Sequence, residues 1–158
     1  MIIHKNFLSK EDFKKLELVI MGDAMPWYFN ENIVLNNKND FQFTYTFIVN
    51  GKQNCHQDMI NILNPILFKL KFKKINGIKA NLLSKEHKIK EHGMHIDQKE
   101  GTTGILYMNT CNGYTKFEDG TKIKSEKNKY IEFNSTLKHT GSSCTDKQRR
   151  VVINFNYQ

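Results

Sequence analysis

Two histidines and one aspartate are the residues of this chain whose types and spacing could hold a metal ion. His95 and Asp97 are two positions apart, and on an extended strand residues at this spacing point to the same face. His139 follows beyond several predicted strands. Two imidazoles and one carboxylate bind one face of an ion and leave the other face open, which suits Fe(II) with a co-substrate and oxygen. We therefore predict a metal site of His95, Asp97 and His139.

The last predicted strand begins with the only two arginines of the chain, Arg149 and Arg150. A guanidinium binds a carboxylate through two parallel hydrogen bonds, which lysine cannot reproduce. Strand alternation places Arg149 on an apolar face and Arg150 on the face that carries Asn154 and Asn156. If the polar face lines a pocket, Arg150 binds the carboxylate with Asn154 beside it; if the apolar face does, Arg149 takes this role. We favour Arg150.

The elements that must position these groups are two helices followed by many short strands. Ser9 caps a predicted helix that ends at Gly22, and a second helical stretch covers residues 56–72, where Pro65 either kinks the helix or begins its second part. This order predicts an α+β, mainly β, cupin-like jelly roll with the N-terminal helices packed on one sheet. The predicted strands are 41–47, 78–83, 88–92, 103–109, 115–117, 129–133 and 151–157.

Length, composition and charge indicate one soluble domain. The 158 residues suffice for a single core, with a helical support over about 1–74 and a jelly-roll core over about 75–158. The net charge of +8 would suit nucleic acid, but the lysines are spread along the chain, as on a solvated surface. Three cysteines without paired spacing fit a reducing cytosol, and we recognise no signal or membrane segment. We expect a cytoplasmic monomer or weak dimer that contacts no membrane.

Several short motifs occur in an order that is typical of one family. They are His95-x-Asp97, residues 106–109, residues 113–117, His139-Thr140-Gly141, and the arginine pair before the closing strand. In these motifs the chain resembles the iron(II) and 2-oxoglutarate-dependent oxygenases, in their prolyl-4-hydroxylase-like branch. It looks most like the short versions carried by marine phages and bacteria, which would place it in a host cytoplasm. The resemblance covers about residue 79 to the C-terminus.

The resemblance implies a double-stranded β-helix, the same architecture as the jelly roll, and a set of ligands. His95, Asp97 and His139 would hold Fe(II), and the arginine of the final strand would bind the distal carboxylate of 2-oxoglutarate. Tyr107 would give that carboxylate a hydroxyl donor. Oxygen would be the second co-substrate and ascorbate the reductant. The implied activity is hydroxylation of an unidentified substrate with release of succinate and CO2. By analogy, a protein side chain such as prolyl is favoured over a small molecule or a nucleobase.

Lys79, Asn81, Trp27 and His92 are four further side chains with a predicted role. Lys79 and Asn81 share one face of a strand that leads to the metal site, and could contact the substrate or the co-substrate. Trp27, in an aromatic loop after the first helix, could form a lid over the substrate. His92 is expected to be a structural group or a group that supports the ligands, and not itself a ligand, because on a strand it would face away from His95.

Two other classes of protein fit the same sequence. A cupin-like binding module would use its histidines and aspartate to hold a structural metal or nothing, and would not turn over 2-oxoglutarate. A nucleic-acid-binding protein would use its lysines, and its affinity would fall steeply with salt concentration.

Overall fold

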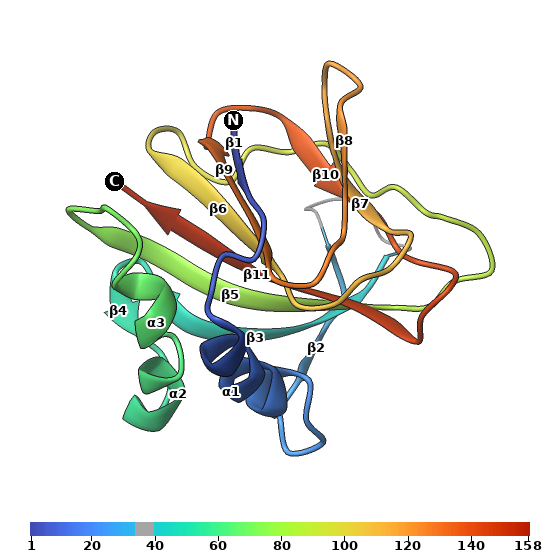
Figure 1. The fold of residues 1–158 in the computed structure, drawn as a ribbon. Coiled ribbons are helices and arrows are strands. Elements are labelled where there is room, and N and C mark those ends of the chain that lie inside the picture. The colour runs from blue at the N-terminus through green and yellow to red at the C-terminus, as the bar shows by residue number, and fades with distance from the viewer. Residues whose placement is uncertain (34–39) are drawn as a thin grey trace.

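The computed structural model describes residues 1–33 and 40–158, which form two antiparallel β-sheets with helices on one side (Figure 1). The major sheet has the strand order β1-β9-β6-β11-β5-β3-β2, with β4 paired to β3. The minor sheet has the order β10-β7-β8. The strands are β1 Ile2–His4, β2 Tyr28–Asn30, β3 Gln42–Val49, β4 Lys52–Gln53, β5 Ile75–Ser84, β6 Thr102–Tyr107, β7 Tyr114–Phe117, β8 Lys122–Lys124, β9 Lys129–Asn134, β10 His139–Gly141 and β11 Arg149–Tyr157.

The helices cover the outer face of the major sheet (Figure 1). Helix α1 (Lys10–Ile20) begins after Ser9, whose side chain accepts a hydrogen bond from the Asp12 backbone N–H at 3.1 Å. Helices α2 (Gln57–Asn61) and α3 (Asn64–Leu67) follow β4. Apolar side chains of the helices and of the outward face of β11 form one core, which includes Phe13, Leu16, Ile20, Ile66, Val151, Ile153 and Phe155. This core fixes β11 in the sheet and turns its other face inward.

On the inward face of the major sheet, side chains of β3, β5 and β11 lie in register with one another. The register places Lys79 on β5 opposite Thr46 on β3 and opposite Asn154 on β11. One step along the same strands, Asn81 pairs with Thr44 and Val152. Because neighbouring side chains in such a row lie on one face of the sheet, these polar groups form a floor beneath the minor sheet.

The two facing sheets form a double-stranded β-helix, and the predicted fold class is confirmed. The alternative that Pro65 begins a second helix is also correct, because it lies in the first turn of α3. The predicted helix 56–72 is nevertheless too long, since α3 ends at Leu67. The N-terminal part is more than a helical support, because β1, β2 and β3 belong to the major sheet. Among the described residues, no helix has the length and apolar character that crossing a membrane requires.

The predicted strand at 88–92 does not form. Within this range the structure has one isolated bridge, between Glu91 and Ser142, and otherwise irregular backbone. The segment joins β5 to the residues that precede β6, and its path is set by contacts to β10 and the loop after it, including Thr140 Oγ1 donating to His92 O at 2.8 Å. Alternation arguments therefore fail for this segment.

The packing of α1 on the sheet gives a stability test with a matched control. Leu16 is 1% exposed in the core, whereas Leu18, on the same helix, is 68% exposed. We expect Leu16→Ala to lower the free energy of unfolding by about 2–5 kcal/mol, because it removes buried methyl groups and leaves a cavity. Leu18→Ala should change it by about 0.5 kcal/mol or less. Urea denaturation of both variants measures the difference, and equal effects would contradict this packing.

Candidate metal centre and its cavity

The backbone brings the two histidines of the candidate metal centre together. His95 N–H donates to His139 O at 3.0 Å, and His139 N–H donates to His95 O at 2.9 Å. Their ring centroids are 4.8 Å apart. Asp97 completes the group, and the ligating atoms of the three residues all lie within 4.8 Å of one another. The structure thus gathers the three residues that the sequence analysis selected.

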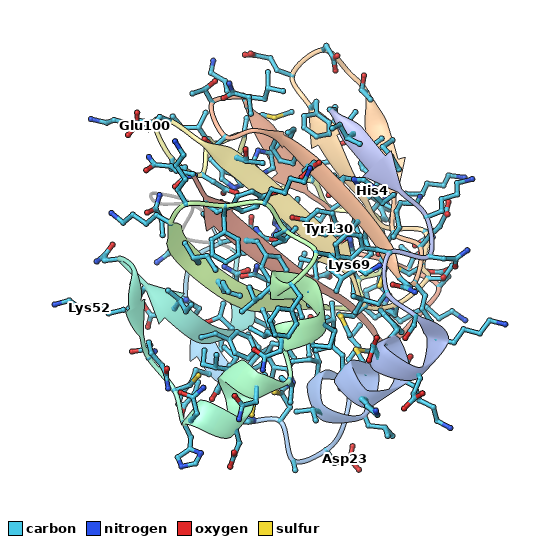
Figure 2. The ribbon with its side chains drawn as sticks, turned by 60° about the vertical axis from the view of Figure 1, so that its left-hand side comes forward. His4, Asp23, Lys52, Lys69, Glu100 and Tyr130 are labelled. Atoms are coloured by element: carbon cyan, nitrogen blue, oxygen red, sulfur yellow. The ribbon has the colours of Figure 1, made fainter. Side chains whose placement is uncertain are left out.

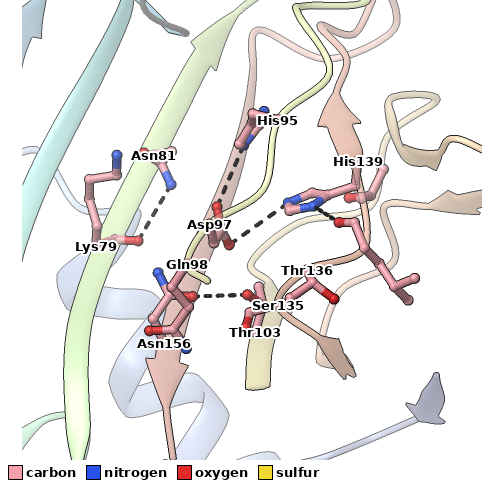
Figure 3. Close-up of polar contacts among 12 residues, drawn as sticks. Lys79, Asn81, His95, Asp97, Gln98, Thr103, Ser135, Thr136, His139 and Asn156 are labelled. Carbon is pink, nitrogen blue, oxygen red and sulfur yellow. Dashed lines mark hydrogen bonds and ion pairs between the residues drawn. The ribbon is translucent and has the colours of Figure 1, made fainter. Parts of the chain in front are cut away.

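Both imidazoles are oriented with Nε2 toward the carboxylate (Figure 3). His95 Nδ1 bonds to Gly93 O and His139 Nδ1 bonds to Leu137 O, each at 3.0 Å. Since a carbonyl oxygen only accepts, Nδ1 carries the proton in the neutral form of each ring, and Nε2 then offers a lone pair. His95 Nε2 lies 3.5 Å from Asp97 Oδ1, and His139 Nε2 lies 3.8 Å from Asp97 Oδ2. Carbonyl contacts of this kind orient histidines that bind metals.

The surroundings of the three candidate ligands shift the pKa of each of them. Burial acts to raise the pKa of Asp97, but the hydrogen bond with His95 and the charges of both imidazoles hold this pKa below its ordinary value. Burial lowers the pKa of His139, which favours the neutral ring. For His95 burial acts in the same direction, yet the hydrogen bond to Asp97 leaves its pKa raised. An anionic carboxylate and a neutral imidazole are the forms that bind metal, so the pKa shifts of Asp97 and His139 favour metal binding and that of His95 opposes it.

The three candidate ligands line a cavity of about 490 Å³ between the two sheets. Residues of β3, β5 and β11 form its floor, and residues of β7 and β10 face them from the minor sheet. Arg150 is 3% exposed and lies in the cavity wall. Two glycines leave room for it: a Cβ at Gly113 would lie 2.6 Å from Arg150 Cδ, and one at Gly141 would lie 3.3 Å from Arg150 Nη1. The cavity therefore contains both the candidate metal ligands and a buried guanidinium.

The two arginines point to opposite faces of β11. Arg149 donates from Nη2 to the carbonyl oxygen of Met21 at the end of α1, on the helix side of the sheet. Arg150 points inward, and Asn154 lines the same cavity. The apolar face of β11 packs on the helices and its polar face lines the cavity, which is the case in which the alternation argument selects Arg150.

The structure corrects the role expected for Tyr107. Its side chain is fully buried, and its hydroxyl donates to Thr115 Oγ1 at 2.8 Å instead of lining the cavity. Burial raises the pKa of Tyr107 to about 12, so the hydroxyl keeps its proton. Arg150 Nη2 also donates to Thr115 Oγ1, at 3.2 Å. Because Thr115 accepts both bonds and lines the cavity, its own proton is left to be donated there. The sequence analysis quoted Thr115 within a motif but gave it no role.

The residues predicted near the substrate divide into two groups. Lys79 and Asn81 line the cavity on β5, and Figure 3 shows them beside the three candidate ligands. Burial lowers the pKa of Lys79, and the charge of Asp97 opposes this. Trp27 does not line the cavity; its side chain is half-buried against the outer core, on the helix side of the sheet. The lid assigned to Trp27 is therefore wrong.

His92 lines the cavity and does not belong to the three candidate ligands. Because residues 88–92 are not a strand, His92 does not face away from the site. Its Nδ1 lies 3.1 Å from Asp40 Oδ2, and Lys90 also pairs with Asp40. Burial lowers the pKa of His92, despite the hydrogen bond to Asp40. The contact with Asp40 holds the ring at the edge of the cavity.

Several buried polar atoms of the cavity have no hydrogen-bond partner among the described residues. Buried polar groups are nearly always hydrogen-bonded, so a concentration of exceptions in one cavity indicates a polar ligand. The atoms are Asn81 Oδ1, His92 Nε2, Asp97 Oδ2, Arg150 Nε and Asn154 Oδ1. They include a carboxylate oxygen at the metal centre and a guanidinium N–H, so a metal and an anion would each satisfy part of this set.

Comparison with known proteins supports the fold. No family model matches the sequence, and no curated protein is significantly similar to it. The structure is similar to a Pseudomonas putida prolyl-4-hydroxylase, with a TM-score of 0.65 and 10% identity over 99% of this chain and 92% of that one. It is also similar to a Trichoplax adhaerens prolyl hydroxylase solved with a peptide fragment of the hypoxia inducible factor oxygen degradation domain, with a TM-score of 0.65 and 14% identity over 99% and 82%.

A third similar structure is an oxidoreductase of the 2OG-Fe(II) oxygenase family from Burkholderia pseudomallei. Its TM-score is 0.60, with 12% identity over 84% of this chain and 72% of that one. At such identities these similarities establish a shared fold. The chain has the dioxygenase-like double-stranded β-helix, and the activity must be argued from its own site.

Metal binding can be tested without turnover. We expect Fe(II) or Mn(II), added without oxygen, to raise the melting temperature, because a metal at 100 times its Kd adds about 2.7 kcal/mol to stability. Asp97→Ala and His139→Ala should remove this increase. The control is Asp58→Ala: Asp58 Oδ2 is 3.2 Å from His56 Nδ1 in an exposed pair with the same His-x-Asp spacing. A metal effect that survives Asp97→Ala, or is lost in Asp58→Ala, would contradict the assignment.

Proposed function

We propose that the protein is an Fe(II)- and 2-oxoglutarate-dependent dioxygenase that hydroxylates its substrate with release of succinate and CO2. The observation that carries this proposal is one cavity holding His95, Asp97 and His139 together with the buried Arg150. The fold shared with 2-oxoglutarate oxygenases supports it.

The chain's own residues have distinct parts in this reaction. His95, Asp97 and His139 would hold Fe(II) on one face and leave its other positions open. When bound, iron with 2-oxoglutarate and oxygen supplies the oxidation of a C–H bond to an alcohol. Arg150 would bind the distal carboxylate of 2-oxoglutarate, with Thr115 as hydroxyl donor beside it. Ascorbate would serve as the reductant.

The charges of the cavity fit a dianion. Among the described lining residues, Lys79 and Arg150 are the cationic side chains and Asp97 is the carboxylate. With Fe(II) bound, positive charge exceeds negative charge in a site largely removed from water, where charges interact strongly. A dicarboxylate that reaches from the metal to Arg150 would offset two of these positive charges, which supports 2-oxoglutarate over a neutral co-substrate.

The favoured substrate is a protein side chain such as prolyl, ahead of a small molecule or a nucleobase. The support is analogy: one similar structure is a prolyl hydroxylase solved with a peptide fragment. We also propose that the protein is soluble and cytoplasmic, and that it is active as a monomer or weak dimer.

Turnover tests the proposal directly. We expect the protein to convert 2-oxoglutarate to succinate in the presence of Fe(II), oxygen and ascorbate, measured by mass spectrometry of the products. Asp97→Ala and His139→Ala should reduce the rate at least about 100-fold, because each removes a metal ligand. His56→Ala, at an exposed histidine outside the cavity, should leave it unchanged. Metal binding without succinate formation would favour the cupin-like module, and salt-sensitive nucleic-acid affinity without turnover would favour the third class.

The arginine assignment has its own matched pair. We expect Arg150→Lys to weaken 2-oxoglutarate binding by about 10- to 150-fold, because loss of a charge-assisted hydrogen bond costs roughly 1.5–3 kcal/mol. Arg149→Lys should change this affinity little, since Arg149 contacts Met21 on the other side of the sheet. Isothermal titration of the Mn(II)-loaded variants measures both affinities. A larger loss in Arg149→Lys would reverse the assignment.

A further inference from the structure

Lys79 is a cation of the cavity that the proposed reaction does not use. The distal carboxylate of the co-substrate is matched by Arg150, and its other carboxylate together with Asp97 is matched by the charge of Fe(II). One positive charge then remains, on Lys79. Removing a charge from water is costly unless it is paired, so this ammonium is expected to have an anionic partner among the molecules that enter the cavity.

The position of Lys79 separates it from the proposed carboxylate site of Arg150. In the β-sheet register Lys79 pairs with Asn154 on β11, four residues beyond Arg150, whereas Arg150 itself pairs with Leu83. On its other side Lys79 pairs with Thr46 on β3. Figure 3 shows Lys79 on the strand beside Asp97 and His95, at the metal end of the cavity that all three line. A group bound there would lie beside the metal centre.

The surroundings of Lys79 supply hydrogen bonding without a counter-charge. Among the described residues, neither a hydrogen bond nor an ion pair within 4.0 Å engages its ammonium group. Asn81 and Asn154 each present a buried side-chain oxygen without a partner, and Asn81 Nδ2 donates to Lys79 O at 3.5 Å. An ammonium with two amide oxygens is complementary to a group that combines a carboxylate with an N–H or O–H donor.

We propose that Lys79 binds a carboxylate of the substrate, so that the substrate class is a carboxylate-bearing compound with a neighbouring N–H or O–H donor. This inference rests on the proposed function, since it places the substrate next to the metal and the co-substrate. A free amino acid and an acidic residue within a peptide both offer this chemistry. A prolyl residue inside a neutral peptide does not, so the inference narrows the choice that analogy left open.

Matched pairs of probes test the charge requirement. The pairs are L-proline with L-prolinamide, L-aspartate with L-asparagine, and a short aspartyl peptide with its asparaginyl counterpart. Binding to the Mn(II)-loaded protein is measured by titration calorimetry, with and without 2-oxoglutarate. We expect the acidic member of at least one pair to bind about 10-fold or more tightly than its amide. The pair that shows this distinguishes a free acid from a peptide.

Variants of Lys79 assign the effect to the residue. Lys79→Met keeps the length of the side chain and removes its charge, and should abolish the preference for the acidic probe. Lys79→Arg should retain part of it. Lys52→Met, at an exposed lysine of β4, is the control. The affinity for 2-oxoglutarate should change by less than about twofold in Lys79→Met, because Arg150 binds the co-substrate's distal carboxylate.

Each remaining outcome overturns the inference. It fails if acidic probes bind no better than amides, if none of the probes binds, or if the preference survives Lys79→Met. It also fails if Lys79→Met weakens 2-oxoglutarate binding about 10-fold, because Lys79 would then belong to the co-substrate site. The protein could also prefer acidic probes through Lys79 and yet form no succinate. That result would support the anion site at Lys79 and contradict the proposed dioxygenase activity.

Discussion

The reciprocal backbone pairing of His95 with His139 is the interaction on which the site depends. One histidine lies on irregular backbone after β5, and the other begins β10 of the minor sheet. Their two hydrogen bonds join these segments and set the spacing of the imidazoles before any ion is bound. Each ring is then fixed by its Nδ1 contact to a local carbonyl. Preorganisation of this kind means that a metal ion orders little of the chain when it binds.

Arg150 imposes the second constraint, because a guanidinium inside a protein is stable only when its donors are satisfied. Thr115 accepts one bond, the ring of Tyr107 lies 5.6 Å from the guanidinium carbon, and Arg150 Nε has no partner among the described residues. Burial lowers the pKa of Arg150, so its environment disfavours the charge. The cavity wall thus holds a cation whose solvation is incomplete until an anion arrives.

The sequence predicted those parts of the site that depend on regular periodicity. The choice between Arg149 and Arg150 follows from alternation because β11 is a continuous strand, paired on both sides over most of its length. The same reasoning fails at His92, where the chain is irregular. Alternation also cannot tell how far a side chain lies from the cavity. Tyr107 and Thr115 both belong to strands, and the packing of β7 over β6 decides which of their hydroxyl groups reaches the cavity. Trp27 shows a third limit of the sequence analysis. An aromatic residue after a helix can pack in a core or cover a site, and the sequence does not distinguish the two.

The two sheets contribute different residues to the site and differ in how they are supported. The major sheet is backed by the helical core, so the residues on its inward face, including Lys79 and Arg150, project from a rigid surface. The minor sheet has short strands and supplies His139 and Thr115. Gly113 and Gly141 permit close approach between the sheets, because a side chain at either position would meet Arg150. The approach of the minor sheet to Arg150 therefore depends on these glycines, while the spacing of the two histidines depends on the His95–His139 pairing. A molecule that enters the cavity must fit between Arg150 and the metal centre, over the polar floor that Lys79, Asn81 and Asn154 provide.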